Sequence, residues 1–163
     1  MHHPGVDIKH ILYATDFSEN ARYAFSYAAS LADRYGAKIT LLHVSRDAIP
    51  DLLVFDVGID RSAGVKERFS VTKEHLKEAE AALLDMVRTE FGRETIGSDD
   101  IVVEKGDPVK VILRVAKERN CDLMVMGITG RRSLEDAMLG DTARRVLHRT
   151  TLPVLVVQHP DQG

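Results

Sequence analysis

Cysteine is almost absent from this sequence, and the lone Cys121 excludes a fold held together by intramolecular disulfides. The chain also lacks any apolar stretch near the roughly 18 residues of a membrane span, and no signal peptide is visible. Neither charge dominates, because 22 basic residues are mixed with 25 acidic ones along the chain, which leaves no broad basic face for nucleic acid. These absences predict a cytoplasmic protein whose partners include neither a membrane nor a nucleic acid.

The length and composition suit one domain. With 163 residues and a hydrophobic content of 44%, we expect residues 1–163 to form a single domain around one good core. Cys121 lies in an apolar run with no CxxC motif and no candidate base beside it, which indicates a core residue and not a nucleophile. His2 and His3 have no third ligand nearby, so we assign them no metal.

Short apolar runs alternate with amphipathic segments, which predicts the order β-α-β-α-β-α-β-α-β. Ser18 and Asp107 precede helical patterns as expected N-caps, and Gly36 follows the first helix as its stop. With right-handed crossovers, the alternation predicts an α/β fold with a doubly wound parallel sheet. The expected strands are residues 10–14, 38–44, 100–105, 123–126 and 154–157, and the expected helices are 18–35, 71–91, 108–120 and 142–149. In the last of these helices, we expect Ala143, Val146 and Leu147 to face inward and Arg144 and Arg145 to face outward.

A glycine pattern follows the fourth expected strand. Gly127, Gly130 and Gly140 have the spacing G-x2-G-x9-G, and an amphipathic segment begins after the last of them. Open α/β sheets bind ligands at the carboxyl ends of their strands. Glycines there let backbone amides approach an anion, and the next helix supplies free N–H groups at its amino end. The spacing is neither the dinucleotide fingerprint nor the P-loop.

With this glycine pattern, the sequence resembles the universal stress proteins, whose nucleotide-binding members carry G-x2-G-x9-G followed by Ser or Thr. The likeness extends to the first strand, to the turn at residues 106–108 and to the PVLVV run at residues 153–157. It implies a Rossmann-like, five-stranded sheet with the strand order 3-2-1-4-5. The first and fourth strands would then lie side by side at the topological switch point, where their carboxyl ends meet across one crevice.

The resemblance also implies a site for an adenine nucleotide, ATP, ADP or AMP, with or without Mg²⁺ or Mn²⁺. Asp16 and the backbone around Val44 would hold the adenosine. Each of two residues also has a structural alternative: Asp16 could be a turn residue, and His43 could simply end its strand. Arg131 could bind phosphate or be solvated surface. The full expected set is Ala14, Thr15, Asp16, His43, Val44, Met126, Gly127, Thr129, Gly130, Arg131, Gly140, Asp141, Thr142 and Ala143.

Asp141 departs from the family pattern, because it stands where the nucleotide-binding members have Ser or Thr. A carboxylate about 4 Å from a phosphate charge costs roughly 4 kcal/mol at an effective dielectric near 20. Two outcomes stay open at this point: binding of a metal-assisted or shortened nucleotide, and an empty site. Aspartate is also among the best N-caps, so Asp141 could instead serve the helix that follows.

Three functions are compatible with these patterns. The first is a regulatory module that binds an adenine nucleotide. The second is a slow metal-dependent ATPase, although no paired general base and nucleophile is apparent. The third is a nucleotide-free interaction module that uses its dimer edge and the apolar connection at residues 46–63. The resemblance implies a homodimer through the edge strand Val154–Val157, since the family pairs this strand across a two-fold axis.

Overall fold

The computed structural model describes residues 4–46, 73–93, 96–128 and 139–162. It contains a parallel sheet of five strands in the order β3-β2-β1-β4-β5, which confirms the expected topology. The connection at residues 46–63, apart from Arg46, lies outside the described residues. The strands are β1 (His10–Thr15), β2 (Lys38–Ser45), β3 (Ile101–Lys105), β4 (Leu123–Gly127) and β5 (Val154–Val157).

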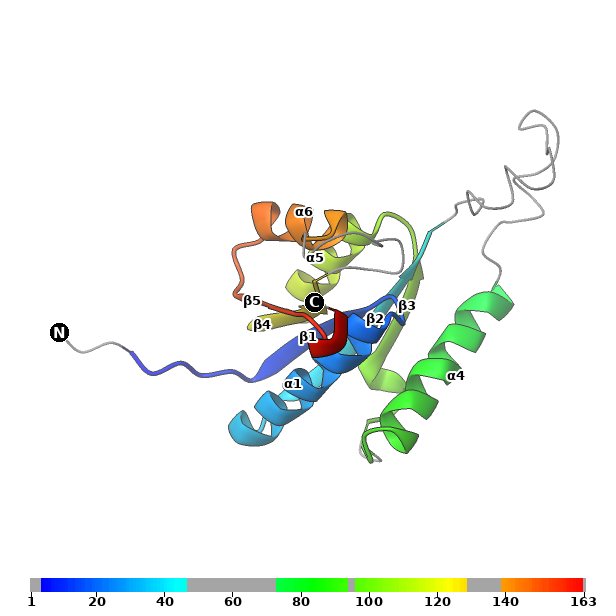
Figure 1. Cartoon of the computed structure of the whole chain (residues 1–163), viewed down its shortest axis with the longest axis horizontal. Helices are drawn as coiled ribbons and strands as arrows, with labels where there is room; N and C mark the ends of the chain where they lie inside the picture. Colours follow the sequence, from blue (N-terminus) through cyan, green and yellow to red (C-terminus); the bar gives the residue numbers. More distant parts are fainter. Residues whose placement is uncertain (1–3, 47–72, 94–95, 129–138, 163) are drawn as a thin grey trace.

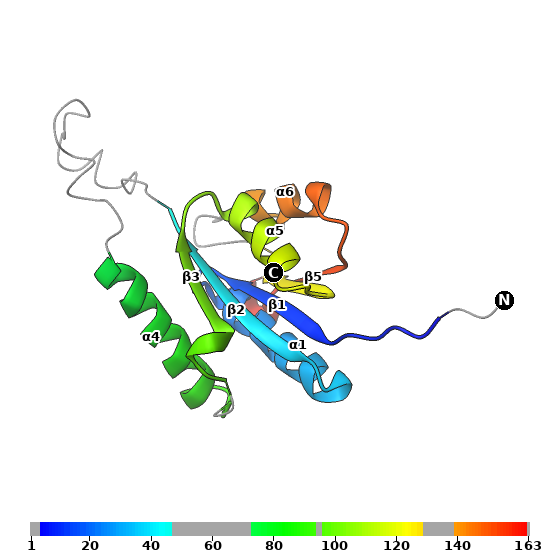
Figure 2. The ribbon, with the colours of Figure 1, turned by 180° about the vertical axis from the view of Figure 1, so that it is seen from behind.

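The helices lie on both faces of this sheet, as Figure 1 shows. In the view from behind, α4 runs beside β3 on one face, and α5 and α6 lie together on the other (Figure 2). Two short 3-10 helices, η1 (Ser98–Asp100) and η2 (Pro160–Gln162), complete the described elements. The α-helices are α1 (Glu19–Tyr35), α4 (Lys73–Thr89), α5 (Pro108–Glu118) and α6 (Asp141–Arg149).

Each face of the sheet has its own hydrophobic core. Ile11 and Tyr13 of β1 point to the face covered by α1 and α4, whereas Leu12 between them points to the face covered by α5 and α6. This alternation follows from the two-residue period of a strand. Because both faces are covered, the central strands are apolar along nearly their whole length. Cys121 belongs to the second core and is only 5% exposed, which confirms that it is a core residue.

Local sequence signals set the expected helix ends. Ser18 caps α1 by accepting a hydrogen bond from Ala21 N at 3.2 Å, and Gly36 ends it in the left-handed conformation with φ 64°. Asp107 caps α5 by accepting from Lys110 N at 3.0 Å, with Pro108 at the first helical position.

Not every local expectation is confirmed. The third strand begins at Ile101 and not at residue 100, because Asp100 belongs to η1, where its carboxylate accepts a hydrogen bond from Gly97 N at 3.0 Å. Leu147 was expected to face the core of the last helix, but its side chain is 41% exposed. Val146 and Ala143 supply the buried side of this short helix.

Candidate functional site

The sheet register brings the expected site segments to one edge. Ala14 of β1 pairs with Met126 of β4, and Thr15 pairs with His43 of β2. Because all three strands are parallel, their carboxyl ends open on the same side, and the residues that follow them lie in neighbouring positions. Asp16 and Gly127 are therefore close in space, although more than a hundred residues separate them in the chain. This edge is the topological switch point.

The loop after β1 is built by short side-chain contacts. The Asp16 carboxylate accepts a hydrogen bond from Ser18 N at 3.0 Å, and the Thr15 hydroxyl accepts from Phe17 N, also at 3.0 Å. Between them, Phe17 has a φ of 64°, a left-handed conformation that is unusual for a side chain of this size. Asp16 therefore acts as a turn residue, which was the structural alternative given for it above. The turn places its carboxylate at the switch point.

His43 holds the end of β2 against this loop. Its Nδ1 lies 2.9 Å from the Thr15 carbonyl oxygen, which can only accept, so Nδ1 carries the proton and donates. The ring centroids of His43 and Phe17 are 4.7 Å apart. These two contacts direct the histidine ring toward the loop after β1 and so support the strand-end interpretation of His43.

Gly127 is required by packing. A Cβ atom at this position would meet Ala21 N at 2.8 Å and the Asn20 carbonyl carbon at 3.0 Å, closer than real Cβ contacts allow. The missing side chain therefore lets the first turn of α1 lie directly against the end of β4. This close approach gives Gly127 a reason to be glycine that is independent of any ligand.

The amino end of α6 lies next to β4. Gly140, with φ −59° and ψ 156°, is its N-cap and makes no side-chain capping bond, so the interpretation of Asp141 as the cap is wrong: Asp141 is the first helical residue. The Gly140 N–H donates to the Ile128 carbonyl oxygen at 2.8 Å and is already engaged. The first N–H that bonds within the helix belongs to Arg144, whose acceptor is Gly140 O at 2.9 Å. The N–H groups of residues 141–143 therefore have no partner within α6 and carry its positive dipole end.

Charged side chains gather around these N–H groups, and we call this set the arginine cluster. Arg144 Nη2 lies 2.7 Å from Asp141 Oδ1, and Arg145 Nη1 lies 3.6 Å from Asp141 Oδ2. Arg145 Nη1 also lies 3.8 Å from Asp107 Oδ2 at the start of α5. From the end of β2, Arg46 Nη2 donates to the Thr142 hydroxyl at 3.2 Å. The arginine cluster is Arg46, Asp107, Asp141, Arg144 and Arg145.

The Asp107 carboxylate stays ionised within this cluster. Its hydrogen bond from Lys110 N lowers its pKa, and the charges of Arg145, Lys110 and Arg46 lower it further. Near neutral pH, Asp107 therefore remains a negative partner for Arg145. It joins the amino ends of α5 and α6 through this ion pair.

Most of the arginine cluster was not predicted from the sequence. Arg144 and Arg145 were expected only to face outward, Arg46 only to begin a connection, and Asp107 only to cap a helix. The spacing of Asp141 with the arginines three and four residues later was the one available signal, because such residues are neighbours on a helix. Thr129, Gly130 and Arg131, also expected at the site, lie outside the described residues.

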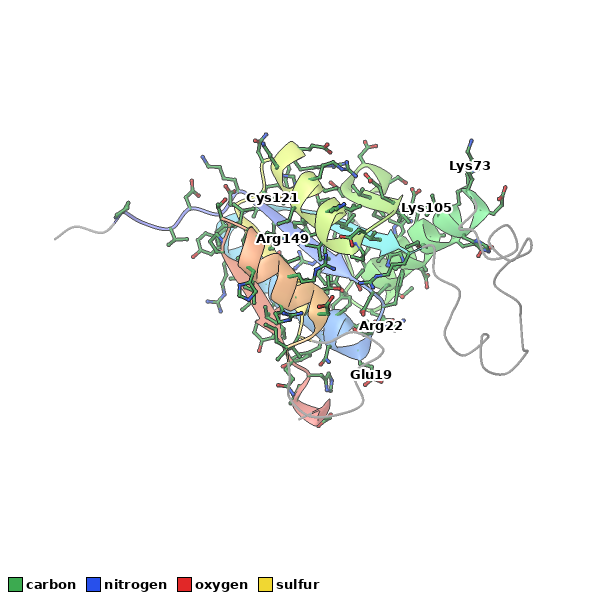
Figure 3. The ribbon with its side chains drawn as sticks, turned by 90° about the horizontal axis from the view of Figure 1, so that it is seen from above. Glu19, Arg22, Lys73, Lys105, Cys121 and Arg149 are labelled. Carbon is green, nitrogen blue, oxygen red and sulfur yellow. The ribbon has the colours of Figure 1, made fainter. Side chains whose placement is uncertain are left out.

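Other chemistry has little support in the part of the chain that the structure describes. It contains no group of three or more His, Cys, Asp or Glu side chains placed to hold a metal ion. Burial raises the pKa of the Cys121 thiol to about 11, so the thiol is protonated near neutral pH and is a poor nucleophile. Figure 3 shows Cys121 at the opposite end of the sheet from Lys105, the last residue of β3. No helix within the described ranges is long and apolar enough to cross a membrane.

The fold and the site together define the class of protein. It is a doubly wound α/β domain with polar residues at the edge where the strand order reverses. The model of the universal stress protein family matches residues 7–158, so the chain belongs to the universal stress protein family. It is similar to universal stress protein MJ0577 of Methanocaldococcus jannaschii, with 31% identity over 92% of this chain and 94% of that protein. The chain is also similar to universal stress protein YxiE of Bacillus subtilis, with 30% identity over 91% of this chain and 97% of that protein.

Solved structures show the same fold. The structure of MJ0577 superimposes with a TM-score of 0.70 and 25% identity, covering 96% of this chain and 99% of that one. A universal stress protein solved in complex with cAMP superimposes with a TM-score of 0.56 and 20% identity, covering 94% of this chain and 98% of that one. These matches confirm the expected fold class, a five-stranded Rossmann-like sheet between helices.

Proposed function

We propose that this protein is a regulatory module that binds an adenine nucleotide at the edge where β1, β2 and β4 end. One observation carries the proposal: the N–H groups of residues 141–143, which have no partner within α6, lie beside the switch point, and Arg46, Arg144 and Arg145 contact side chains of the same turn. Backbone N–H groups at a helix amino end, together with arginines, form a site suited to phosphate.

The proposed roles follow the positions along this edge. The β1 end with Asp16 and the β2 end with Val44 receive the adenosine, and the segment from Met126 and Gly127 leads to the phosphates. At the phosphate end, the N–H groups of Asp141, Thr142 and Ala143 are the donors, since the Gly140 N–H already donates to Ile128 O. Ala14, Thr15 and His43 shape the adenosine end, and Thr129, Gly130, Arg131 and Gly140 complete the proposed set.

The charges at this edge fit a nucleotide phosphate. The Asp141 carboxylate argues against it, but this carboxylate is paired with Arg144 at 2.7 Å. A neighbouring cation reduces the repulsion of roughly 4 kcal/mol that an unpaired carboxylate would exert on a phosphate about 4 Å away. A divalent ion, if used, would arrive bound to the nucleotide phosphates, as Mg²⁺ commonly does.

The family supports the proposal in a general way. A relative of the same fold has been solved in complex with cAMP, so an adenine nucleotide can be held by this architecture. At 20% identity that likeness shows the fold alone, and the nucleotide site of this chain rests on its own residues. Signalling or stress regulation would then depend on whether the nucleotide is bound.

The first test is a calorimetric titration of the purified protein with ATP, ADP and AMP, each with and without Mg²⁺. We expect saturable binding of at least one of them at micromolar affinity, equivalent to about −8 kcal/mol. Mass analysis of a heat-denatured aliquot would identify nucleotide that copurifies with the protein, and ADP formed from ATP during the titration would reveal the slow ATPase alternative. No heat with any nucleotide, and none released from the aliquot, would contradict the proposal and favour the nucleotide-free interaction module.

We also propose that the protein is a homodimer through β5, the last strand of the described sheet. Val154, Leu155 and Val156 are partly exposed although all three are aliphatic. An aliphatic edge strand of this kind is an aggregation hazard unless another element covers it. A second copy of the same strand would cover it symmetrically.

A further inference from the structure

The Asp141 carboxylate already pairs with two of the three arginines of the arginine cluster at the amino end of α6. One of its oxygens lies 2.7 Å from Arg144 Nη2, and the other lies 3.6 Å from Arg145 Nη1. A carboxylate held between arginines resembles one end of a phosphate group in both charge and hydrogen-bonding geometry. Asp141 therefore stands in the place where an outer phosphate would meet its cations.

Within the described residues of the arginine cluster, the remaining positive charge is small. Three arginines face two carboxylates in the arginine cluster, so its formal charge is only one positive unit. Arg145 pairs with both Asp141 and Asp107. The lowered pKa of Asp107 keeps the Asp107 carboxylate ionised near neutral pH. A phosphate monoester carries about two negative charges near neutral pH. Every further phosphate of ADP or ATP adds negative charge that this cluster does not match.

We propose that Asp141 makes this site select adenine nucleotides with a short phosphate chain, so that AMP binds at least as tightly as ATP. The inference rests on the proposed function and names the ligand class within it. In the proposed arrangement, the phosphate next to the adenosine would lie by β4 and Gly127, whereas a longer chain would extend along the amino end of α6 past Asp141. Each added phosphate must either displace the carboxylate from Arg144 and Arg145 or lie beside it.

Both possibilities weaken the binding of a long phosphate chain. Asp141 and Arg144 are 60% and 56% exposed, and an exposed ion pair of this kind is weak, so a phosphate can displace it. The displaced carboxylate nevertheless remains attached to the first residue of α6, within Coulomb range of the incoming phosphate. The selectivity therefore comes from the fixed position of the negative charge and does not depend on the strength of the ion pair.

Two substitutions test the inference. Asp141→Ser restores the hydroxyl of the family pattern, and Asp141→Asn removes the charge while it keeps nearly the same shape. We expect both to raise the affinity for ATP by roughly tenfold, the equivalent of about 1.4 kcal/mol, and to change the affinity for AMP less than about twofold. Titrations of AMP, ADP and ATP without added metal measure the three constants for each protein, and thermal unfolding verifies that each variant is folded.

Asp99→Ser is the matched control, because Asp99 is exposed in η1, which precedes β3 at the opposite end of the sheet. It should leave the ratio of ATP to AMP affinity unchanged. If the wild-type protein binds ATP much more tightly than AMP, or if both Asp141 variants keep the wild-type ratio, the inference is wrong while the nucleotide site stands. If no variant binds any of the three nucleotides, the proposed function fails, and the inference fails with it.

Discussion

At the scale of single residues, Gly127 and Asp141 show how a motif position can serve the fold as well as a ligand. Gly127 belongs to the glycine pattern, yet the nearest atoms to its missing side chain belong to the backbone of α1. Asp141 departs from the pattern, yet it begins α6 and pairs with arginines on the same helix. Both residues therefore have structural roles, and experiments must distinguish the effect of a substitution on stability from its effect on ligand binding.

Gly127→Ala should destabilise the protein even without a ligand. The new Cβ would lie 2.8 Å from Ala21 N, and backbone atoms can yield only if α1 moves away from β4. Overpacking of this kind typically costs about 1–3 kcal/mol of unfolding free energy, which denaturant titration measures. The control is Gly97→Ala, since nothing lies within 4 Å of its Cβ position, and it should change stability by no more than about 0.5 kcal/mol. Equal stability of the two variants would contradict the packing role of Gly127.

At the scale of elements, one arginine after α4 joins two helices on the same face of the sheet. Arg93 Nη1 and Nη2 donate to the two carboxylate oxygens of Asp33 at 2.6 and 2.7 Å, and Nη2 also donates to the Ala29 carbonyl oxygen at 2.9 Å. Both acceptors belong to α1. A bidentate arginine of this kind fixes the direction in which the chain leaves α4.

This ion pair should make the stability depend on pH. The hydrogen bonds from Arg93 lower the pKa of Asp33 in the folded protein, so the unfolded chain binds more protons at acidic pH. The contribution is present above the ordinary carboxyl pKa of about 4 and is lost as the pH falls through the lower folded value. Arg93→Gln should therefore lose less unfolding free energy than the wild type between about pH 6 and pH 3.

Denaturant titrations at the two pH values measure this difference. Arg88→Gln is the control, because Arg88 is an exposed residue in the last turn of α4 and carries the same charge change. It should retain the wild-type dependence on pH. A pH dependence of Arg93→Gln that equals that of the wild type would show that the Asp33 ion pair contributes nothing measurable.

At the scale of the whole molecule, the sheet presents one aliphatic edge. Pro153 O accepts from Met124 N at 3.0 Å, and Val157 O accepts from Ile128 N at 2.8 Å. In a parallel ladder, alternate residues bond to the same neighbour, so the backbone groups of Val154 and Val156 point away from β4. These groups are the ones that a second copy of β5 would bind.

Val156→Pro should therefore convert the proposed dimer into a monomer. The proline removes the outward N–H, and proline is tolerated on an edge strand when its lost N–H does not face the sheet. Light scattering at micromolar concentration should give about twice the chain mass of 18.1 kDa for the wild type and the chain mass for the variant. Val156→Thr keeps the N–H and should remain dimeric. A wild-type protein found only as the 18.1 kDa species would refute the dimer.

The elements of the fold were predictable because their signals are local. Ser18 and Asp107 cap their helices through contacts within three residues, and Gly36 ends α1 through its own backbone conformation. The arginine cluster was not predictable in the same way. Arg46 and Thr142 are 96 positions apart and meet only because β2 and α6 converge at one edge. No periodicity or spacing in the chain records such a contact.

The alternation of strands and helices and the caps of α1 and α5 could be predicted from the amino-acid sequence, and the strand order followed from the family resemblance. These depend on backbone preferences and on hydrophobic periods that act over a few residues. Three features became clear only from the folded structure: Gly140 and not Asp141 caps α6, Gly127 makes room for α1, and Asp141 lies between two arginines. Those outcomes depend on distances between atoms, and such distances exist only after packing has brought separate segments together.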